Sequence, residues 1–186
     1  NYNLYCSSTR LIDANDELIG LNLINTKPSF KHSLVQSIAG GNTYLFDNKV
    51  KNLLLNISEN FKLPSHDWTI YQIAAAHDLN IIYDKSPSIK YRLHDKNTIG
   101  TSFSLFAKLK RIKLLFSDVY KNWNNQNIRI LLLYKSSMSK TNQNFLKIFE
   151  INRNGNLIER IRIFTKYLVR RSSFIQNAAL LIGLIC

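Results

Sequence analysis

Glycine, proline and cysteine are scarce in this chain, whose 186 residues include 6 Gly, 3 Pro and 2 Cys. So few Gly and Pro exclude a collagen-like or low-complexity disordered chain. Cys6 and Cys186 lie near opposite ends without CxxC or Cys/His spacing, which excludes a zinc finger and a disulfide scaffold and indicates a reducing compartment. With 45% hydrophobic residues, the chain is expected to fold around a buried core.

Acidic residues are also few, and almost none lie in the second half. Residues 1–107 hold ten Lys and Arg against nine Asp and Glu, whereas residues 108–186 hold fifteen against three. Nearly all of the net charge of +13 therefore belongs to the second half. A polyanion is its expected partner, either nucleic acid or the anionic leaflet of a membrane, unless the charge simply solvates ordinary helices.

Long hydrophobic runs are missing as well. The longest apolar run, residues 178–186, is shorter than the ~20 residues of a spanning helix, so it is expected to touch a membrane without crossing it. The first residues lack an initiator Met and the basic and apolar regions of a secretory signal. The chain is therefore expected to begin inside a longer protein.

Residues 1–101 show α/β alternation. A strand, a polar loop and a returning strand are expected within 2–20, and helices are expected where polar caps precede apolar residues at helical spacing. The predicted helices cover 29–38, the stretch after Asp47, and Ser65 to about Asp78. Further strands are expected at 43–46, 80–83 and 88–91, with a Pro-containing turn at 84–87.

From Phe103 onward the pattern becomes helical. About four helices are expected, separated by polar breaks at 122–127, 136–141, 152–156 and 170–173. Within them, apolar residues such as Phe145, Phe164 and Leu168 alternate with Lys and Arg, which is typical of interfacial helices. The same stripe could instead pack on the first part of the chain.

Two short clusters could carry chemistry. Asp67, between His66 and Trp68, lies in a first helical turn, where backbone N–H groups stabilise a carboxylate that could act as a base. Arg92 and His94 follow a strand and suit an anionic ligand or a metal diphosphate. Taken alone, the first cluster could serve only the helix dipole, and the second could be surface decoration.

Together the clusters resemble the second half of the family 2 glycosyltransferases, above all the rhamnosyltransferase-like members that build bacterial O-antigen and capsule chains. The resemblance rests on the order His-Asp-Trp, a helix, a strand, and Tyr91-Arg-x-His-x-x-Asn-x-x-Gly100. Residues 41–46, Gly-Asn-Thr-Tyr-Leu-Phe, resemble the Gly-x-Thr strand of the acceptor side. The resemblance covers residues 1 to about 101 well and the remainder loosely.

The resemblance implies a Rossmann-like GT-A fold that transfers a sugar, with inversion, from a nucleotide-diphospho-sugar with the help of Mg or Mn. Asp67 matches the general base, with His66 in reserve for that role. Arg92 and His94 match positions near the leaving diphosphate or its metal, and His94 is the metal ligand that this chain could offer. The acceptor and sugar pocket is implied to be lined by Gly41, Asn42, His66 and Trp68.

The Asp-x-Asp metal motif of the family does not occur in this sequence. The chain is therefore interpreted as the C-terminal portion of a GT-A enzyme, with an acceptor-side part at 1–101 and a basic helical extension at 102–186, and as inactive in isolation. The complete enzyme is expected on the cytoplasmic face of the cell membrane, extending a lipid-linked surface polysaccharide with rhamnose or another hexose.

Two other functions stay open. The basic second half could bind nucleic acid, but no RNP, zinc-finger or helix-turn-helix signature accompanies it, so nucleic acid is not the expected partner. The chain could also be a non-catalytic scaffold at a membrane surface. In the GT-A interpretation, a sheet without the N-terminal strands of the fold has an unprotected edge, so the isolated chain is expected to aggregate or form oligomers.

Overall fold

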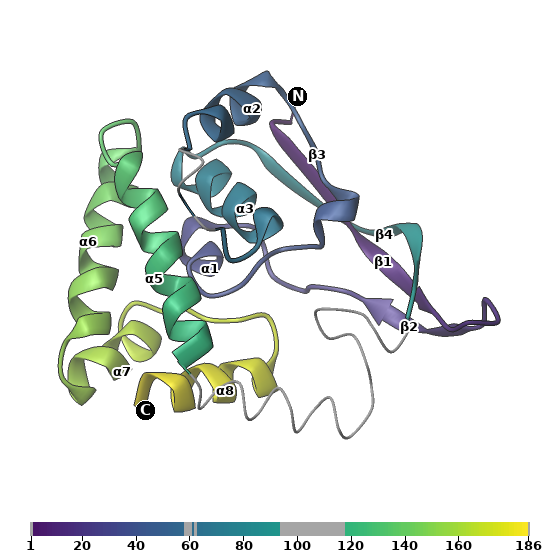
Figure 1. Ribbon diagram of the computed structural model, residues 1–186. Helices are drawn as coiled ribbons and strands as arrows, with labels where there is room; N and C mark the ends of the chain where they lie inside the picture. Colours follow the sequence, from purple (N-terminus) through teal and green to yellow (C-terminus); the bar gives the residue numbers. More distant parts are fainter. Residues whose placement is uncertain (1, 58–60, 62, 94–117, 186) are drawn as a thin grey trace.

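The computed structural model describes residues 2–57, 61, 63–93 and 118–185. They form an α/β structure in which an open mixed sheet lies on one side and the C-terminal helices on the other (Figure 1). The shorter helices of the first half lie between these two layers (Figure 1). The α/β class predicted from the sequence is therefore confirmed.

The sheet is built around β1, Leu4–Ile12. One side of β1 pairs antiparallel with β2, Leu18–Asn22, and with the short β3, Leu45–Phe46. The other side pairs in parallel with β4, Ile81–Arg92, along its whole length. The predicted strand, loop and return within residues 2–20 are confirmed as the β1–β2 hairpin, and a central position explains why most of β1 is buried.

The sequence prediction of two strands separated by a turn at 84–87 is wrong, because β4 is one strand. Its pairing with β1 advances from Asp84 to Ile89 while β1 advances only from Ser7 to Thr9. The extra residues form an irregularity that contains Pro87. A proline cannot donate to a ladder but is tolerated where pairing is interrupted, so it marks a bulge here and not the end of a strand.

Two predictions for residues 29–46 are also wrong in extent. The helix α1 covers only Phe30–Ser33, and the predicted strand 43–46 is a short helical turn η1, Gly41–Thr43, followed by β3. In a longer α1, the Ser33 carbonyl would accept from the backbone four residues later. It accepts instead from the side chains of Trp68, at 2.6 Å, and Gln72, at 2.9 Å, so tertiary contacts end the helix.

The helices after Asp47 and Ser65 form as predicted. α2 covers Asn48–Leu55 and begins where the Asp47 carboxylate accepts from the backbone N–H groups of Lys49 and Val50. α3 covers His66–Ala76 and is almost entirely buried after its first turn.

Four helices form the described part of the second half: α5, Asp118–Leu133; α6, Lys140–Asn154; α7, Leu157–Thr165; and α8, Phe174–Ile185. The predicted breaks near 136–141, 152–156 and 170–173 are confirmed. The predicted break at 122–127 is wrong, because these residues lie inside α5. Asn124 is used there for docking, since its amide donates to the Leu34 carbonyl at 2.8 Å. Across the described helices, none is long and apolar enough to cross a membrane.

One hydrophobic core joins both halves of the chain. Cys6 of β1 and Tyr71 of α3 belong to the same buried cluster as Leu131 of α5, Phe149 of α6 and Ile163 of α7. Part of the predicted interfacial stripe packs against this cluster, including Phe145 and Phe164. The predicted domain boundary at 101/102 falls among residues that the structure does not describe and stays a prediction.

A buried histidine ties the C-terminal segment to the first half. The Nδ1 atom of His32 lies 3.1 Å from the Tyr71 hydroxyl, and its Nε2 atom lies 3.0 Å from the Ser172 hydroxyl. Nearby, the Arg171 guanidinium donates to the Val35 carbonyl at 2.9 Å. These contacts fix the segment between α7 and α8 on α1 and α3.

His32 should make folding stability fall in mild acid. Burial, with the Arg171 charge as a smaller cause, lowers the pKa of His32 from 6.5 to about 4. The imidazole of the unfolded chain binds a proton more tightly than that of the folded chain, so protonation of His32 opposes folding. The fold therefore has the full contribution of the neutral ring above pH 6.5, and this contribution is lost as the pH falls toward 4. Its size is about 3 kcal/mol.

Urea unfolding of the wild type and His32→Gln at several pH values tests this expectation. The variant loses the imidazole contacts and should be less stable at neutral pH. The difference between the two proteins should narrow by about 3 kcal/mol as the pH falls to about 4. A difference that stays constant over this range would contradict the assignment.

Candidate active site

The candidate site lies at the N-terminal end of α3. Ser65 occupies the N-cap position in extended conformation, as predicted, but its side chain makes no capping hydrogen bond. The Ser65 hydroxyl instead donates to the Asp67 carboxylate. This role of Ser65 was not predicted from the sequence, although a serine two residues before the candidate base is a visible signal.

Three donors hold the Asp67 side chain. Its Oδ1 atom accepts from the Ser65 hydroxyl and from the Trp68 backbone N–H at 2.8 Å, and its Oδ2 atom accepts from the Gly41 N–H at 3.3 Å. A carboxylate can accept about four hydrogen bonds, so Oδ2 keeps the capacity to accept one more. The side chain is only partly buried, which leaves the carboxylate oriented and within reach of a ligand.

Gly41 lies close against the start of α3. A Cβ atom on Gly41 would collide with the His66 ring and lie 3.3 Å from the Cβ atom of Asp67. A larger residue here would require the exposed His66 ring to move aside, and glycine lets η1 donate its N–H to Asp67 without that movement. The structure thus brings together Gly41, His66 and Asp67, which the sequence assigned to one site, and places the exposed Asn42 next to them.

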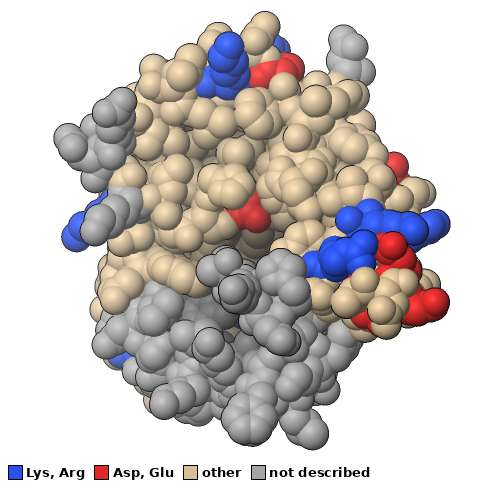
Figure 2. All heavy atoms as spheres, turned by 45° about the vertical axis from the view of Figure 1, so that its right-hand side comes forward, with Lys and Arg blue, Asp and Glu red and all other residues tan. Residues whose placement is uncertain are grey.

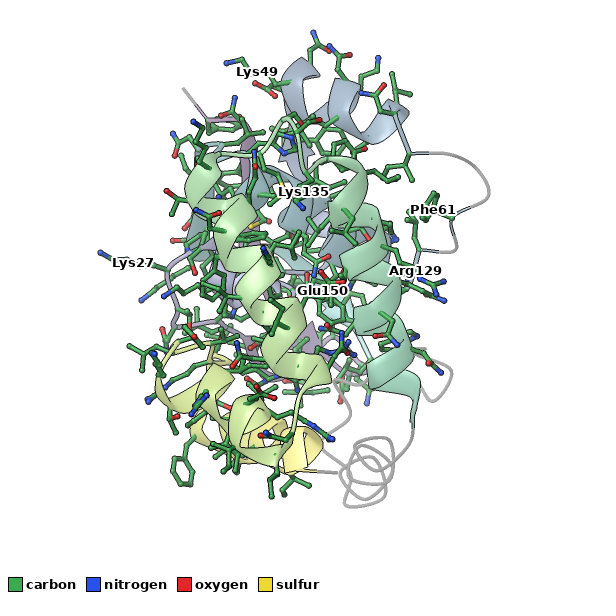
Figure 3. The ribbon with its side chains drawn as sticks, turned by 90° about the vertical axis from the view of Figure 1, so that its left-hand side faces the viewer. Lys27, Lys49, Phe61, Arg129, Lys135 and Glu150 are labelled. Atoms are coloured by element: carbon green, nitrogen blue, oxygen red, sulfur yellow. The ribbon has the colours of Figure 1, made fainter. Side chains whose placement is uncertain are left out.

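A mainly apolar hollow of about 290 Å³ adjoins the site and has His66 in its lining. It is formed by the end of α2, the start of α3 and the described residues between them. Figure 3 labels Phe61, one of its lining residues. The lining comprises Leu54, Ile57, Phe61, Leu63, His66, Thr69 and Ile70.

Trp68 points into the protein. Its side chain is 7% exposed, and its indole N–H donates to the Ser33 carbonyl at 2.6 Å. The neighbouring Thr69 and Gln72 are buried as well. The expected contribution of Trp68 to a sugar pocket stays a prediction.

Arg92 lies apart from this cluster, at the hairpin end of the sheet opposite Ile12. Its guanidinium forms an ion pair with Asp16 at 2.7 Å and donates to the carbonyls of Asp13 and Ala14. Figure 2 shows Lys and Arg beside Asp and Glu at this edge of the molecule. The predicted diphosphate contact of Arg92 stays a prediction, and His94 lies outside the described residues.

The described residues contain no group of three or more His, Cys, Asp or Glu side chains that could hold a metal ion. At the candidate site, only His66 and Asp67 carry such donors. They do not by themselves fit a resident Mg or Mn ion, because octahedral oxygen-rich coordination needs more ligands.

Comparison with known proteins gives one partial likeness. Over 56 residues the chain is 34% identical to a dTDP-rhamnosyl transferase, RfbG, from Shigella flexneri. The aligned stretch is 30% of this chain and 19% of that protein, so the chain spans a small part of its relative. No family model matches, and no solved structure matches. The likeness supports a relationship to glycosyltransferases and nothing finer.

Proposed function

We propose that this chain is the acceptor-side portion of an inverting family 2 glycosyltransferase with a GT-A fold, and that Asp67 is its general base. The observation that carries the proposal is the Asp67 carboxylate. It is fixed by Gly41, Ser65 and the backbone of Trp68, yet it retains acceptor capacity on Oδ2. The likeness to a rhamnosyl transferase supports the same class of reaction.

In this reaction the acceptor hydroxyl donates its hydrogen bond to Oδ2 of Asp67. As the acceptor oxygen attacks the anomeric carbon, its proton passes to the carboxylate, a new C–O bond forms, and the bond to the nucleoside diphosphate breaks with its electron pair on the phosphate. A single displacement of this kind inverts the anomeric carbon. Gly41 and Ser65 serve as positioning residues, because they orient the base without touching the reacting atoms.

The donor side of the enzyme is proposed to lie outside the cluster formed by Gly41, Ser65 and Asp67. Arg92 and His94 are the residues of this chain proposed to approach the leaving diphosphate, and a divalent cation is proposed only for the complete enzyme. The proposed donor is a nucleotide-diphospho-sugar of rhamnose or another hexose. The proposed acceptor is a lipid-linked saccharide of a surface polysaccharide at the cytoplasmic face of the membrane.

A transfer assay on the complete gene product tests the proposal. With dTDP-rhamnose or another nucleotide-diphospho-hexose and a saccharide acceptor, NMR of the product should show the anomeric configuration opposite to that of the donor. The isolated 186-residue chain, assayed as the control, should show no transfer. Retained configuration, or no transfer from any nucleotide sugar by the complete protein, would contradict the proposed function.

A further inference from the structure

Several large apolar side chains of α7, of α8 and of the segment between them are exposed to solvent. Phe174 and Ile175, adjacent at the start of α8, are 88% and 79% exposed. α7 packs against α8, and both lie at the end of the molecule opposite α2 (Figure 1). These exposed residues of α7, α8 and the segment between them, together called the apolar patch, are Leu157, Ile158, Leu168, Phe174 and Ile175.

Leu168, one of the patch residues, has a strained backbone conformation. Its φ of 56° lies in the left-handed region, which favours glycine, at the turn that ends α7. The turn closes through hydrogen bonds from Tyr167 N to Arg162 O and from Val169 N to Ile163 O. A leucine here strains the backbone, and because its side chain is 57% exposed, its burial offsets only part of that strain.

The stretch of chain that carries the patch is rich in cations and has almost no acids. Residues 157–175 contain five Lys and Arg and one acid, Glu159, whose carboxylate accepts from the Asn156 N–H in a capping box. The exposed Arg170 is held 4.7 Å from the Phe164 ring centroid, and the exposed Lys166 lies 5.6 Å from that of Tyr167. The exposed apolar side chains and the positive charges thus belong to the same segment of the chain.

We propose that the apolar patch inserts into the surface of an anionic lipid bilayer, with Phe174 and Ile175 reaching the acyl boundary and Lys166 and Arg170 meeting the phosphate headgroups. Nucleic acid would satisfy the cations but offers no medium for exposed aliphatic side chains, whereas a bilayer satisfies both. The inference does not depend on the proposed chemistry, since it concerns another end of the molecule.

Vesicle co-sedimentation with the 186-residue chain tests the proposal. The chain should bind vesicles of phosphatidylcholine and phosphatidylglycerol, bind pure phosphatidylcholine more weakly, and lose affinity as salt is added. Binding only to duplex DNA, or dimerisation through the patch without vesicle binding, would overturn the proposal. Sugar transfer is not measured, so failure here would leave the glycosyltransferase proposal unaffected.

Serine replacements test the apolar contribution. The double variant Phe174→Ser with Ile175→Ser should bind the anionic vesicles at least about tenfold more weakly. Leu55→Ser is the matched control, because Leu55 is 71% exposed on α2 at the opposite end of the molecule (Figure 1). Equal losses for the double variant and the control would overturn the assignment.

Leu168→Gly separates membrane binding from folding. Glycine relieves the left-handed strain, so the thermal midpoint should stay the same or rise while vesicle affinity falls. A purely structural Leu168 would give a lower midpoint with unchanged vesicle affinity, and that result would contradict its place in the patch.

Charge removal tests the headgroup contacts. Lys166→Gln with Arg170→Gln should weaken binding by about fivefold for each charge removed. The control pair is Lys49→Gln with Lys135→Gln, because Figure 3 shows both lysines toward the end of the molecule opposite α8. An equal loss from the control pair would indicate attraction by net charge alone and would overturn a localised patch.

Discussion

Asp67→Asn should lower kcat for sugar transfer by the complete gene product by about 10²–10⁴-fold. Asn matches Asp in shape and keeps one oxygen that can accept from Ser65 and from the Trp68 N–H, so the start of α3 should be preserved although the contact from the Gly41 N–H is lost. It cannot take a proton from the acceptor hydroxyl. Steady-state kinetics should therefore show a fall in kcat without a comparable rise in KM for the donor.

Asp47→Asn is the matched control for this experiment. Asp47 also lies at the start of a helix, where its Oδ1 atom accepts from Lys49 N and Val50 N, and asparagine is an equally good N-cap. This variant should keep near wild-type kcat. Equal losses for Asp47→Asn and Asp67→Asn would point to a folding defect, and full activity of Asp67→Asn would remove Asp67 as the base.

His66→Gln addresses the reserve assignment. His66 is exposed beside Gly41 and lines the neighbouring apolar hollow, so its loss should change acceptor binding more than kcat. If His66→Gln abolished transfer while Asp67→Asn retained it, the base would be reassigned to His66.

The elements of the candidate site were predictable because local rules govern them. Ser65 and Asp67 begin a helix by capping and dipole effects, which act within one turn and can be read from a short window of sequence. Gly41 was assigned to the same site only through the family resemblance. The close approach of the turn to the His66 ring, which a Cβ atom on Gly41 would push aside, emerged from the structure.

The failures arise where distant residues decide. α1 ends early because Trp68 and Gln72, more than thirty residues away, occupy the Ser33 carbonyl. Pro87 was predicted to mark a turn. A proline is tolerated inside β4 because the pairing with β1 is interrupted there, and that interruption depends on a distant strand. Asn124 reads as a loop residue, yet its amide is used to dock α5 on the Leu34 carbonyl. No short window contains these partners.

Trp68 is the residue for which the sequence-based role and the observed environment differ most, and its replacement should have the largest effect on stability. Trp68→Ala removes a buried indole at 7% exposure and should lower the free energy of unfolding by about 3–5 kcal/mol. Urea denaturation followed by circular dichroism measures the change. Trp123→Ala, at a half-buried position on α5, is the control and should cost less.

Activity and stability together separate two roles for Trp68. If Trp68 contacts the sugar, the Trp68→Ala variant should have a higher KM and an unchanged free energy of unfolding. If Trp68 is a core residue, the variant should have a lower free energy of unfolding and an unchanged KM. Trp68→Phe sharpens the test, because Gln72 still donates to the Ser33 carbonyl at 2.9 Å when the indole N–H is gone. Phenylalanine should therefore recover most of the stability, and with it the position of Asp67, since the fixed start of α3 is what holds the carboxylate in place.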